Sequence, residues 1–251
     1  MSVILLEAAV GGSVVLWASG VWGAVRRGFF VLTGVTIALC AAGAWLIVRG
    51  EPAGASPSGA RATLALAVLA SLCALWVVLL LARQQGAAHA VGLAASAAGL
   101  VALPLFAELR QRAVPLGVAE LALGALFLGS TLYGLLLGHW YLVERRLDQR
   151  HMIRGAWWYV AGVAAAAGAA GLSALNPAPS TAGTSFSPLL AVPGFTVLLA
   201  VGLVVICALI AGFVWKLARE GGRSIQAATG YFYLAVIMAF SAELSIKYRF
   251  F

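Results

Sequence analysis

The sequence predicts an all-α integral membrane protein, a bundle of about eight transmembrane helices. Hydrophobic runs of about twenty residues, each long enough to cross a bilayer, recur between Val3 and Ile246 with short polar breaks. Of the 251 residues, 63% are hydrophobic and 10% are charged, and the mean hydropathy is +1.02. The runs lack the alternation of a transmembrane β-strand, so helices must satisfy the backbone hydrogen bonds in lipid. We therefore expect one transmembrane helical domain over residues 1–251 and no soluble domain.

Eight helices are expected because a polar or turn-forming break separates each hydrophobic run from the next. In chain order, the predicted helices cover residues 3–24, 29–48, 63–82, 88–106, 117–142, 156–175, 191–214 and 226–246. The breaks, in the same order, are residues 26–28, 49–61, 83–86, 108–115, 144–154, 176–188 and 216–223. Residues 144–154 form the most highly charged break. Residues 176–188 are rich in Pro, Ser, Thr and Gly, which predicts a flexible loop outside the membrane.

The basic residues fall unevenly on the two sides of this arrangement. One side holds ten of them: Arg26, Arg27, Arg83, Arg145, Arg146, Arg150, Arg154, Lys216, Arg219 and Arg223. The other side holds six: Arg49, Arg61, Arg110, Arg112, Lys247 and Arg249. Because short cytoplasmic loops retain Lys and Arg, the first side is expected to be cytoplasmic. An even number of helices then places both termini outside, and we predict a multi-pass protein of the bacterial inner (cytoplasmic) membrane.

The net charge of +8 indicates contact with anionic lipid rather than with nucleic acid, because basic loops at a membrane surface bind lipid headgroups. The sequence has no Walker loop, GxGxxG turn, HExxH helix or Cys/His metal ladder. No catalytic residue and no metal ligand is therefore predicted. Whether the chain belongs to an enzyme stays open; at most we expect a non-catalytic or quinone-binding subunit of a membrane oxidoreductase.

The segment Gly138-His139-Trp140-Tyr141 is the densest group of chemically active side chains in the sequence. An imidazole can donate a hydrogen bond to a quinone carbonyl and exchange protons near neutral pH. Adjacent aromatic rings would supply flat apolar walls for the headgroup. We therefore predict a quinone site at His139, Trp140 and Tyr141. The alternative is that these residues only anchor the helix at the membrane–water interface.

Haem b ligation is a further alternative for His139, with His89 as the second axial ligand. Both histidines are predicted in the same leaflet, toward the cytoplasmic side, and imidazole is a common ligand of haem iron. They lie on separate helices, which is compatible with a haem held between them. The prediction requires the two rings to face each other.

Three glutamates are predicted toward the outer side, where a buried charge is costly and is therefore a candidate for function. Glu243 and Lys247 are four residues apart, so on a helix they share a face and can form an ion pair. A second interpretation is that Glu7, Glu120 and Glu243 form a proton path or an outer quinone pocket. Glu7 also lies near a chain end, where water would be the simplest surrounding.

The end of the sequence resembles a known family. Gly230-Tyr231-Phe232-Tyr233, Ala242-Glu243-Leu244 and Tyr248-Arg249-Phe250 together resemble the end of the membrane anchors of the DmsC and NrfD type, which finish with a Gly-Glu-Leu-like element and an Arg/aromatic tail. Ala242 stands where that element has Gly. The resemblance covers about the last twenty residues. It implies a haem-free bundle of eight helices that exchanges electrons between quinones and an iron–sulfur subunit, with Glu243 as the one residue carried over.

Together these observations predict a membrane-embedded subunit of a respiratory or other redox complex. It would anchor partner subunits, with residues 144–154 as a docking surface, and bind a quinone. Two alternatives come from other classes: a small-solute transporter or channel, and a structural assembly subunit without chemistry of its own. A lateral pocket beside His139 would favour quinone binding, and a polar cavity at the middle of the membrane would favour transport.

Overall fold

The computed structural model describes residues 1–50, 56–109, 113–144, 146–175 and 195–247, and confirms the predicted fold class. The described residues form helices and no strand. The helices are α1 (Ser2–Ala18), α2 (Arg27–Gly50), α3 (Pro57–Leu81), α4 (Gln85–Glu108), α5 (Val114–Val143), α6 (Gln149–Leu175), α7 (Phe195–Glu220) and α8 (Ser224–Lys247). Seven of them, α2 to α8, are long and apolar enough to cross a membrane. The predicted loop at residues 176–188 and the basic residues Arg110, Arg112, Arg145 and Arg249 lie outside the described residues.

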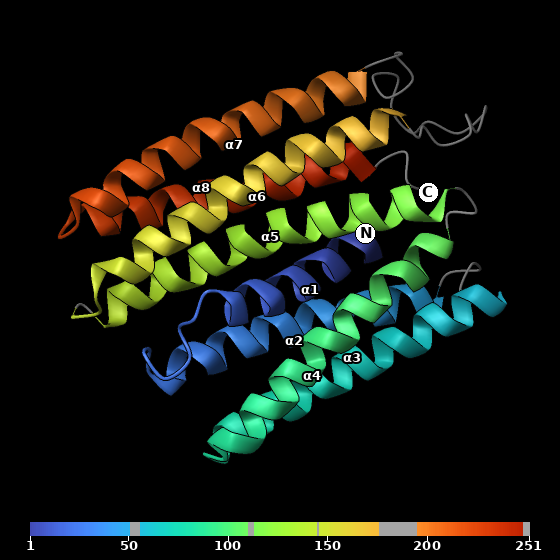
Figure 1. The fold of residues 1–251 in the computed structure, drawn as a ribbon, viewed down its shortest axis with the longest axis horizontal. Helices are drawn as coiled ribbons and strands as arrows, with labels where there is room; N and C mark the ends of the chain where they lie inside the picture. Colours follow the sequence, from blue (N-terminus) through green and yellow to red (C-terminus); the bar gives the residue numbers. More distant parts are fainter. Residues whose placement is uncertain (51–55, 110–112, 145, 176–194, 248–251) are drawn as a thin grey trace.

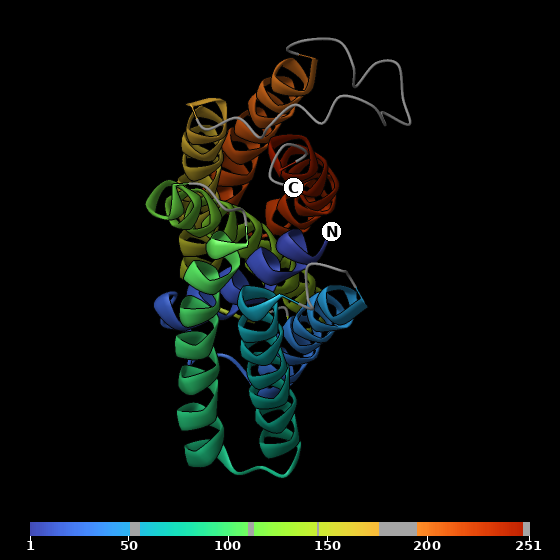
Figure 2. The same ribbon diagram turned by 90° about the vertical axis from the view of Figure 1, so that its right-hand side faces the viewer.

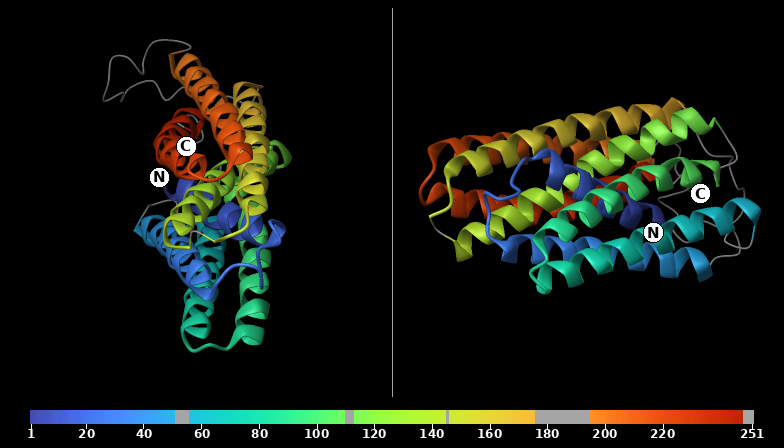
Figure 3. Two further views of the ribbon diagram at one scale, coloured as in Figure 1. Left: turned by 90° about the vertical axis from the view of Figure 1, so that its left-hand side faces the viewer. Right: turned by 60° about the horizontal axis from the view of Figure 1, so that its bottom comes forward.

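The helices alternate in direction and lie side by side (Figure 1). The helices α2, α3 and α4 form one group and α6, α7 and α8 form another, with α1 and α5 between the two groups (Figure 2). The start of α1 and the end of α8 lie toward the same end of the bundle, on the right in Figure 1 and also in the right-hand view of Figure 3. We call this the terminal end. The opposite end, which holds the turns after α1, α3, α5 and α7, is called the basic end, because nine basic residues of the described part of the chain belong to it.

Helix α1 is buried along most of its length. Thirteen of its seventeen residues are buried, against α5, α2 and α4. It ends at Ala18, whereas the sequence predicted a helix to residue 24. Gly20 and Gly23 adopt φ angles of +64° and +79°, in the left-handed region that ends a helix. At 1.5 Å per residue, α1 is about 25 Å long, near the lower limit for crossing the apolar core of a bilayer.

Helix α5 is the most buried of the seven candidate spans, with 78% of its most apolar stretch inside the bundle. Its glycines allow other helices to approach closely, as small residues do in membrane proteins. A Cβ on Gly11 of α1 would collide with the backbone oxygen of Ala125, and a Cβ on Gly129 would collide with the backbone of Gly11. The crossing of α1 and α5 is therefore a contact between two backbones.

Three other helix ends differ from the sequence prediction by six residues or more. Helix α3 begins at Pro57 rather than at residue 63, because the Ser56 side chain accepts a hydrogen bond from the Gly59 backbone nitrogen at 3.0 Å and caps the first turn. Helix α6 begins at Gln149 rather than at residue 156, because the Asp148 carboxylate accepts a hydrogen bond from the Arg150 backbone nitrogen at 2.9 Å and caps the first turn. Helix α7 continues to Glu220 rather than 214, and the turn after it contains Gly221 and Gly222 with positive φ. Charged residues near a membrane surface thus extend these helices instead of breaking them.

Candidate functional site

Four charged side chains from three helices meet inside the bundle, toward its terminal end. They are Glu7 of α1, Glu120 of α5, and Glu243 and Lys247 of α8, which we call the carboxylate cluster. The Lys247 Nζ atom lies 3.2 Å from Glu7 Oε1, 3.2 Å from Glu120 Oε1 and 3.9 Å from Glu243 Oε2. It also donates a hydrogen bond to the backbone oxygen of Glu120 at 3.2 Å. None of the four residues is more than 5% exposed.

The predicted pairing of Glu243 with Lys247 is confirmed, and the structure adds two partners that sequence spacing could not reveal. Glu7 is fully buried rather than in water. Its carboxyl group occupies space that Gly124 leaves open, because a Cβ at that position would lie 2.7 Å from the Glu7 carboxyl carbon. The absence of a side chain on α5 therefore allows an acidic side chain from α1 to reach Lys247.

The carboxyl groups of Glu7 and Glu243 accept no hydrogen bond from any residue that the structure describes. Both form ion pairs with Lys247, Glu7 at 3.2 Å and Glu243 at 3.9 Å. Buried polar atoms are nearly always hydrogen-bonded, because an unpaired polar atom loses its solvation without compensation. Within the described residues, Lys247 is therefore the cation that compensates the charge of both carboxyl groups.

The residues of the Gly-His-Trp-Tyr segment point to three different neighbours. His139 is exposed, and its Nδ1 atom lies 3.0 Å from the Tyr233 hydroxyl of α8. The Trp140 Nε1 atom donates to Glu144 Oε2 at 3.0 Å, and its ring packs on α2. Tyr141 is buried. Because an α-helix turns about 100° per residue, consecutive side chains cannot line one wall, and the structure does not bring these three together.

The hydroxyl group of Tyr141 is part of the turn between α5 and α6. It donates a hydrogen bond to the Asp148 backbone oxygen and accepts one from the Met152 backbone nitrogen at 3.2 Å. Tyr141 also lines a cavity of about 390 Å³ with Gln149, Arg223 and other residues of the basic end. His139 is not among the residues that line this cavity. Tyr141 therefore has a structural role with both of its hydrogen-bonding capacities in use.

A second group of side chains, which we call the aromatic cluster, surrounds His89 at the basic end. It consists of His89 of α4, Trp17 of α1, Trp22 after α1, Phe30 of α2 and Trp76 of α3. The His89 ring lies 5.0 Å from the Trp17 ring and 4.9 Å from the Trp22 ring, edge to face in both cases. Trp22 contacts Phe30 at 4.8 Å, and Trp17 contacts Trp76 at 5.8 Å. Segments far apart in sequence thus build one aromatic site.

Three ring nitrogens of the aromatic cluster are buried and have no hydrogen-bond partner among the described residues. They are Trp17 Nε1, Trp76 Nε1 and His89 Nδ1. Both indoles lie against Gly92, where a Cβ would lie 3.1 Å from Trp76 Nε1 and 3.2 Å from Trp17 Cε2. An indole nitrogen can only donate. The cluster consequently holds two donors that need an acceptor.

The aromatic cluster borders a cavity of about 220 Å³. Trp22 and Phe30 belong to both, and Arg26, Arg27 and Gln85 are among the other lining residues. The Arg27 guanidinium donates to the Leu80 backbone oxygen at 3.1 Å, which fixes it beside the cavity. A flat molecule of modest size could therefore reach the aromatic rings from the basic end.

The surroundings of His89 and His139 are separate. His89 lies among tryptophans of α1 and the following turn, whereas His139 is bonded to Tyr233 of α8. Within the described part of the chain, no contact links the two imidazoles. A haem bound by both histidines would need a different arrangement of these side chains.

Sequence analysis selected His89 but missed the tryptophans around it. Trp17, Trp22 and Trp76 each lie near the end of a hydrophobic run, where tryptophan is commonly an interfacial anchor. A signal was nevertheless present, since these runs end on the same predicted side as His89.

Comparison of the chain with protein-family models, with curated proteins and with solved structures found no match in any of the three.

Proposed function

We propose that this protein is a quinone-binding membrane subunit of a redox complex, and that the quinone headgroup binds in the aromatic cluster. The observation that carries the proposal is the set of three ring nitrogens without a hydrogen-bond partner among the five side chains of the aromatic cluster. An oxidised quinone is a flat ring with two carbonyl acceptors. The indole nitrogens of Trp17 and Trp76 supply donors for such acceptors, and the imidazole of His89 can supply a third hydrogen bond.

The chemistry of His89 suits reduction and oxidation of the bound ring, because imidazole takes up and releases a proton near neutral pH. A quinone that accepts two electrons also takes up two protons, and a quinol releases them. His89 would exchange one of these protons with the basic end, where the cavity lined by Gln85 and Arg27 is located. The partner subunit that supplies or accepts the electrons would dock at this end.

The carboxylate cluster lies too far away to contact the same headgroup. Trp17 and Glu7 are ten residues apart on α1, which separates them by about 15 Å along the helix axis. The earlier expectation that Glu243 binds the quinone would therefore require a second site at the terminal end. In the present proposal Glu243 belongs to a separate proton-exchanging group.

The proposal can be tested with purified protein, by measuring how menadione and decylubiquinone quench tryptophan fluorescence. We expect saturable quenching, a smaller quenched fraction in Trp17→Phe and Trp76→Phe, and an unchanged fraction in Trp45→Phe. His89→Ala should weaken binding about tenfold, the effect of one lost hydrogen bond to a buried group. Unsaturable quenching, or equal affinity in His89→Ala and the wild type, would overturn the proposal.

The same assay separates the two predicted quinone sites. His139→Ala removes the other histidine, which is exposed and bonded to Tyr233. We expect this variant to bind both quinones as the wild type does. Loss of binding in His139→Ala with retention in His89→Ala would instead assign the site to the Gly-His-Trp-Tyr segment.

Proton-coupled transport is a second candidate function, favoured by the carboxylate cluster. Buried carboxyl groups that reach no hydrogen-bond donor, such as Glu243, are typical of proton-carrying sites in membranes. The test uses vesicles that contain the protein and a trapped pH-sensitive dye. Faster proton uptake with the wild type than with Glu243→Gln would support transport, and equal rates would exclude this role for the cluster.

A further inference from the structure

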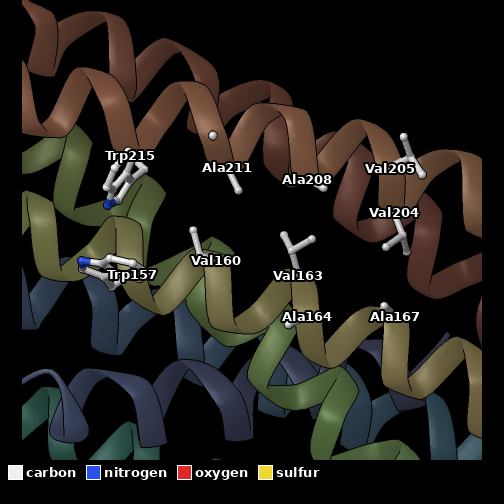
Figure 4. Close-up of a pocket in the computed structure, with 11 residues that line it drawn as sticks. Trp157, Val160, Val163, Ala164, Ala167, Val204, Val205, Ala208, Ala211 and Trp215 are labelled. Atoms are coloured by element: carbon white, nitrogen blue, oxygen red, sulfur yellow. The ribbon is translucent and has the colours of Figure 1, made fainter.

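A long apolar groove runs between α6 and α7 on the surface of the bundle. Its volume is about 580 Å³, and its described lining is almost wholly apolar. Figure 4 shows Val160 and Val163 of α6 facing Ala208 and Ala211 of α7 across the groove. Small side chains line both walls and leave the space open. The groove takes no part in the proposed quinone site, which is built from α1 to α4.

Two tryptophans stand at one end of the groove. The rings of Trp157 and Trp215 are 5.9 Å apart and meet edge to face (Figure 4). The Arg219 guanidinium lies over the Trp215 ring, 4.8 Å from its centre, and is exposed to the surroundings. Lys216 is also exposed on the same turn of α7. The groove thus has a cationic end beside the tryptophans and an apolar body.

The length of the groove matches one leaflet. From Trp157 to Ala167 it extends along ten residue-to-residue steps of α6, which is about 15 Å at 1.5 Å per step. Half of the apolar core of a bilayer is also about 15 Å thick. Tryptophan favours the boundary between apolar core and headgroups. The tryptophan end therefore lies at the membrane surface on the basic end of the bundle, and the groove reaches toward the bilayer midplane.

We propose that this groove binds one acyl chain of an anionic phospholipid, with the lipid phosphate at Arg219. The apolar walls accept the chain, and the guanidinium, held over Trp215, meets the negative headgroup. A zwitterionic lipid would fill the groove equally well but would gain less from Arg219. One cationic side chain near an anionic membrane lipid contributes about a fivefold preference.

Two glycines of α7 provide a matched pair of variants. Gly212 lines the groove and Gly202 does not, and a Cβ at either position would meet nothing within 4 Å. Gly212→Leu fills the groove, whereas Gly202→Leu adds the same side chain to the same helix elsewhere. Arg219→Gln removes the charge and leaves the groove open.

The test measures lipids retained by the purified protein in native mass spectrometry, after incubation with equal amounts of phosphatidylglycerol and phosphatidylcholine. We expect wild type and Gly202→Leu to retain phosphatidylglycerol about fivefold more than phosphatidylcholine. Arg219→Gln should lose this preference but keep lipid, and Gly212→Leu should lose one bound lipid of either kind. Equal lipid retention by Gly212→Leu and Gly202→Leu would overturn the proposal, and so would an unchanged preference in Arg219→Gln. A quinone that Gly202→Leu retains and Gly212→Leu loses would also overturn it, because the groove would then hold a quinone instead of a lipid. If Gly212→Leu does not fold, the preference measured with Arg219→Gln decides alone.

Discussion

The ammonium group of Lys247 lies 3.2 Å from the carboxylate of Glu7, and this contact joins the end of α8 to the start of α1. Both side chains are almost fully buried, with side-chain exposures of 3% and 0%. A charge held at this depth is costly unless an opposite charge compensates it. The pair therefore fixes how two helices from opposite ends of the sequence are positioned, and several measurable consequences follow from it.

Replacing Lys247 with Met should destabilise the protein strongly. The substitution keeps an unbranched side chain, one atom shorter, but leaves Glu7 and Glu243 without the ammonium between them. Removing one partner of a buried ion pair costs about 3–5 kcal/mol. We expect a clear fall in the Tm of the detergent-solubilised protein, measured by differential scanning fluorimetry. Lys216→Met, at an exposed position of α7, should change Tm little. An unaltered Tm in Lys247→Met would mean that the cluster contributes nothing to stability.

Part of this loss should be recovered by a second substitution. Glu7→Gln removes one negative charge from the cluster while keeping the shape of the side chain. The double variant Lys247→Met with Glu7→Gln is expected to have a higher Tm than Lys247→Met alone. Strictly additive losses from the two substitutions would contradict a direct interaction between these residues.

Gly124→Ala should displace the Glu7 carboxyl group. A Cβ at position 124 would lie 2.7 Å from its carboxyl carbon, closer than atoms can approach. Overpacking of this kind costs about 1–3 kcal/mol, so Tm should fall. Gly171→Ala on α6 is the control, because its added Cβ meets nothing within 4 Å. Shortening the acid by one methylene, in Gly124→Ala with Glu7→Asp, should restore part of the loss; no recovery would refute the proposed clash.

Two adjacent glycines of α1 should tolerate substitution very differently. A Cβ on Gly11 would collide with the backbone of α5, which cannot move without separating the helices. On Gly12 it would lie 3.3 Å from the Ile37 side chain, which can shift by a few tenths of an ångström. We expect Gly11→Ala to lower Tm or yield far more than Gly12→Ala does. Equal effects would show that α1 and α5 are not in backbone contact.

The orientation in the membrane can be tested by labelling single cysteines in intact cells. The sequence predicts the basic end on the cytoplasmic side, so Arg83→Cys, in the turn before α4, should react with a membrane-impermeant maleimide only after permeabilisation. Ser58→Cys, near the start of α3, should react in intact cells. The native cysteines at positions 40, 73 and 207 lie within helices and would be replaced by alanine. The reverse pattern would invert the topology.

The fold class could be predicted because it depends on composition summed over long segments. About twenty apolar residues form a membrane helix whatever their order, so the number of helices could be predicted without tertiary information. An even number of helices also places the start of α1 and the end of α8 at the same end of the bundle. The end of α1 was predicted less well. Hydropathy continues through Val21 and Trp22, and only the backbone angles at Gly20 and Gly23 show where the helix stops.

The candidate sites were predictable only where the contact is local. Glu243 and Lys247 are one helical turn apart, and that spacing was sufficient to pair them. The addition of Glu7 and Glu120 depends on how α1, α5 and α8 pack. Packing between helices also decides the surroundings of His139 and Tyr141, which lie close in sequence but contact different residues. For the same reason, the residues around His89 come from other helices and were not predicted.

The burial of α1 has a consequence for how the protein is made. Of the eight helices that the structure describes, α1 leaves the ribosome before the others, yet the side chain that compensates Glu7 belongs to α8, which follows all of them. During synthesis the nascent chain must therefore hold an acidic group near lipid, or delay the insertion of α1, until α8 arrives.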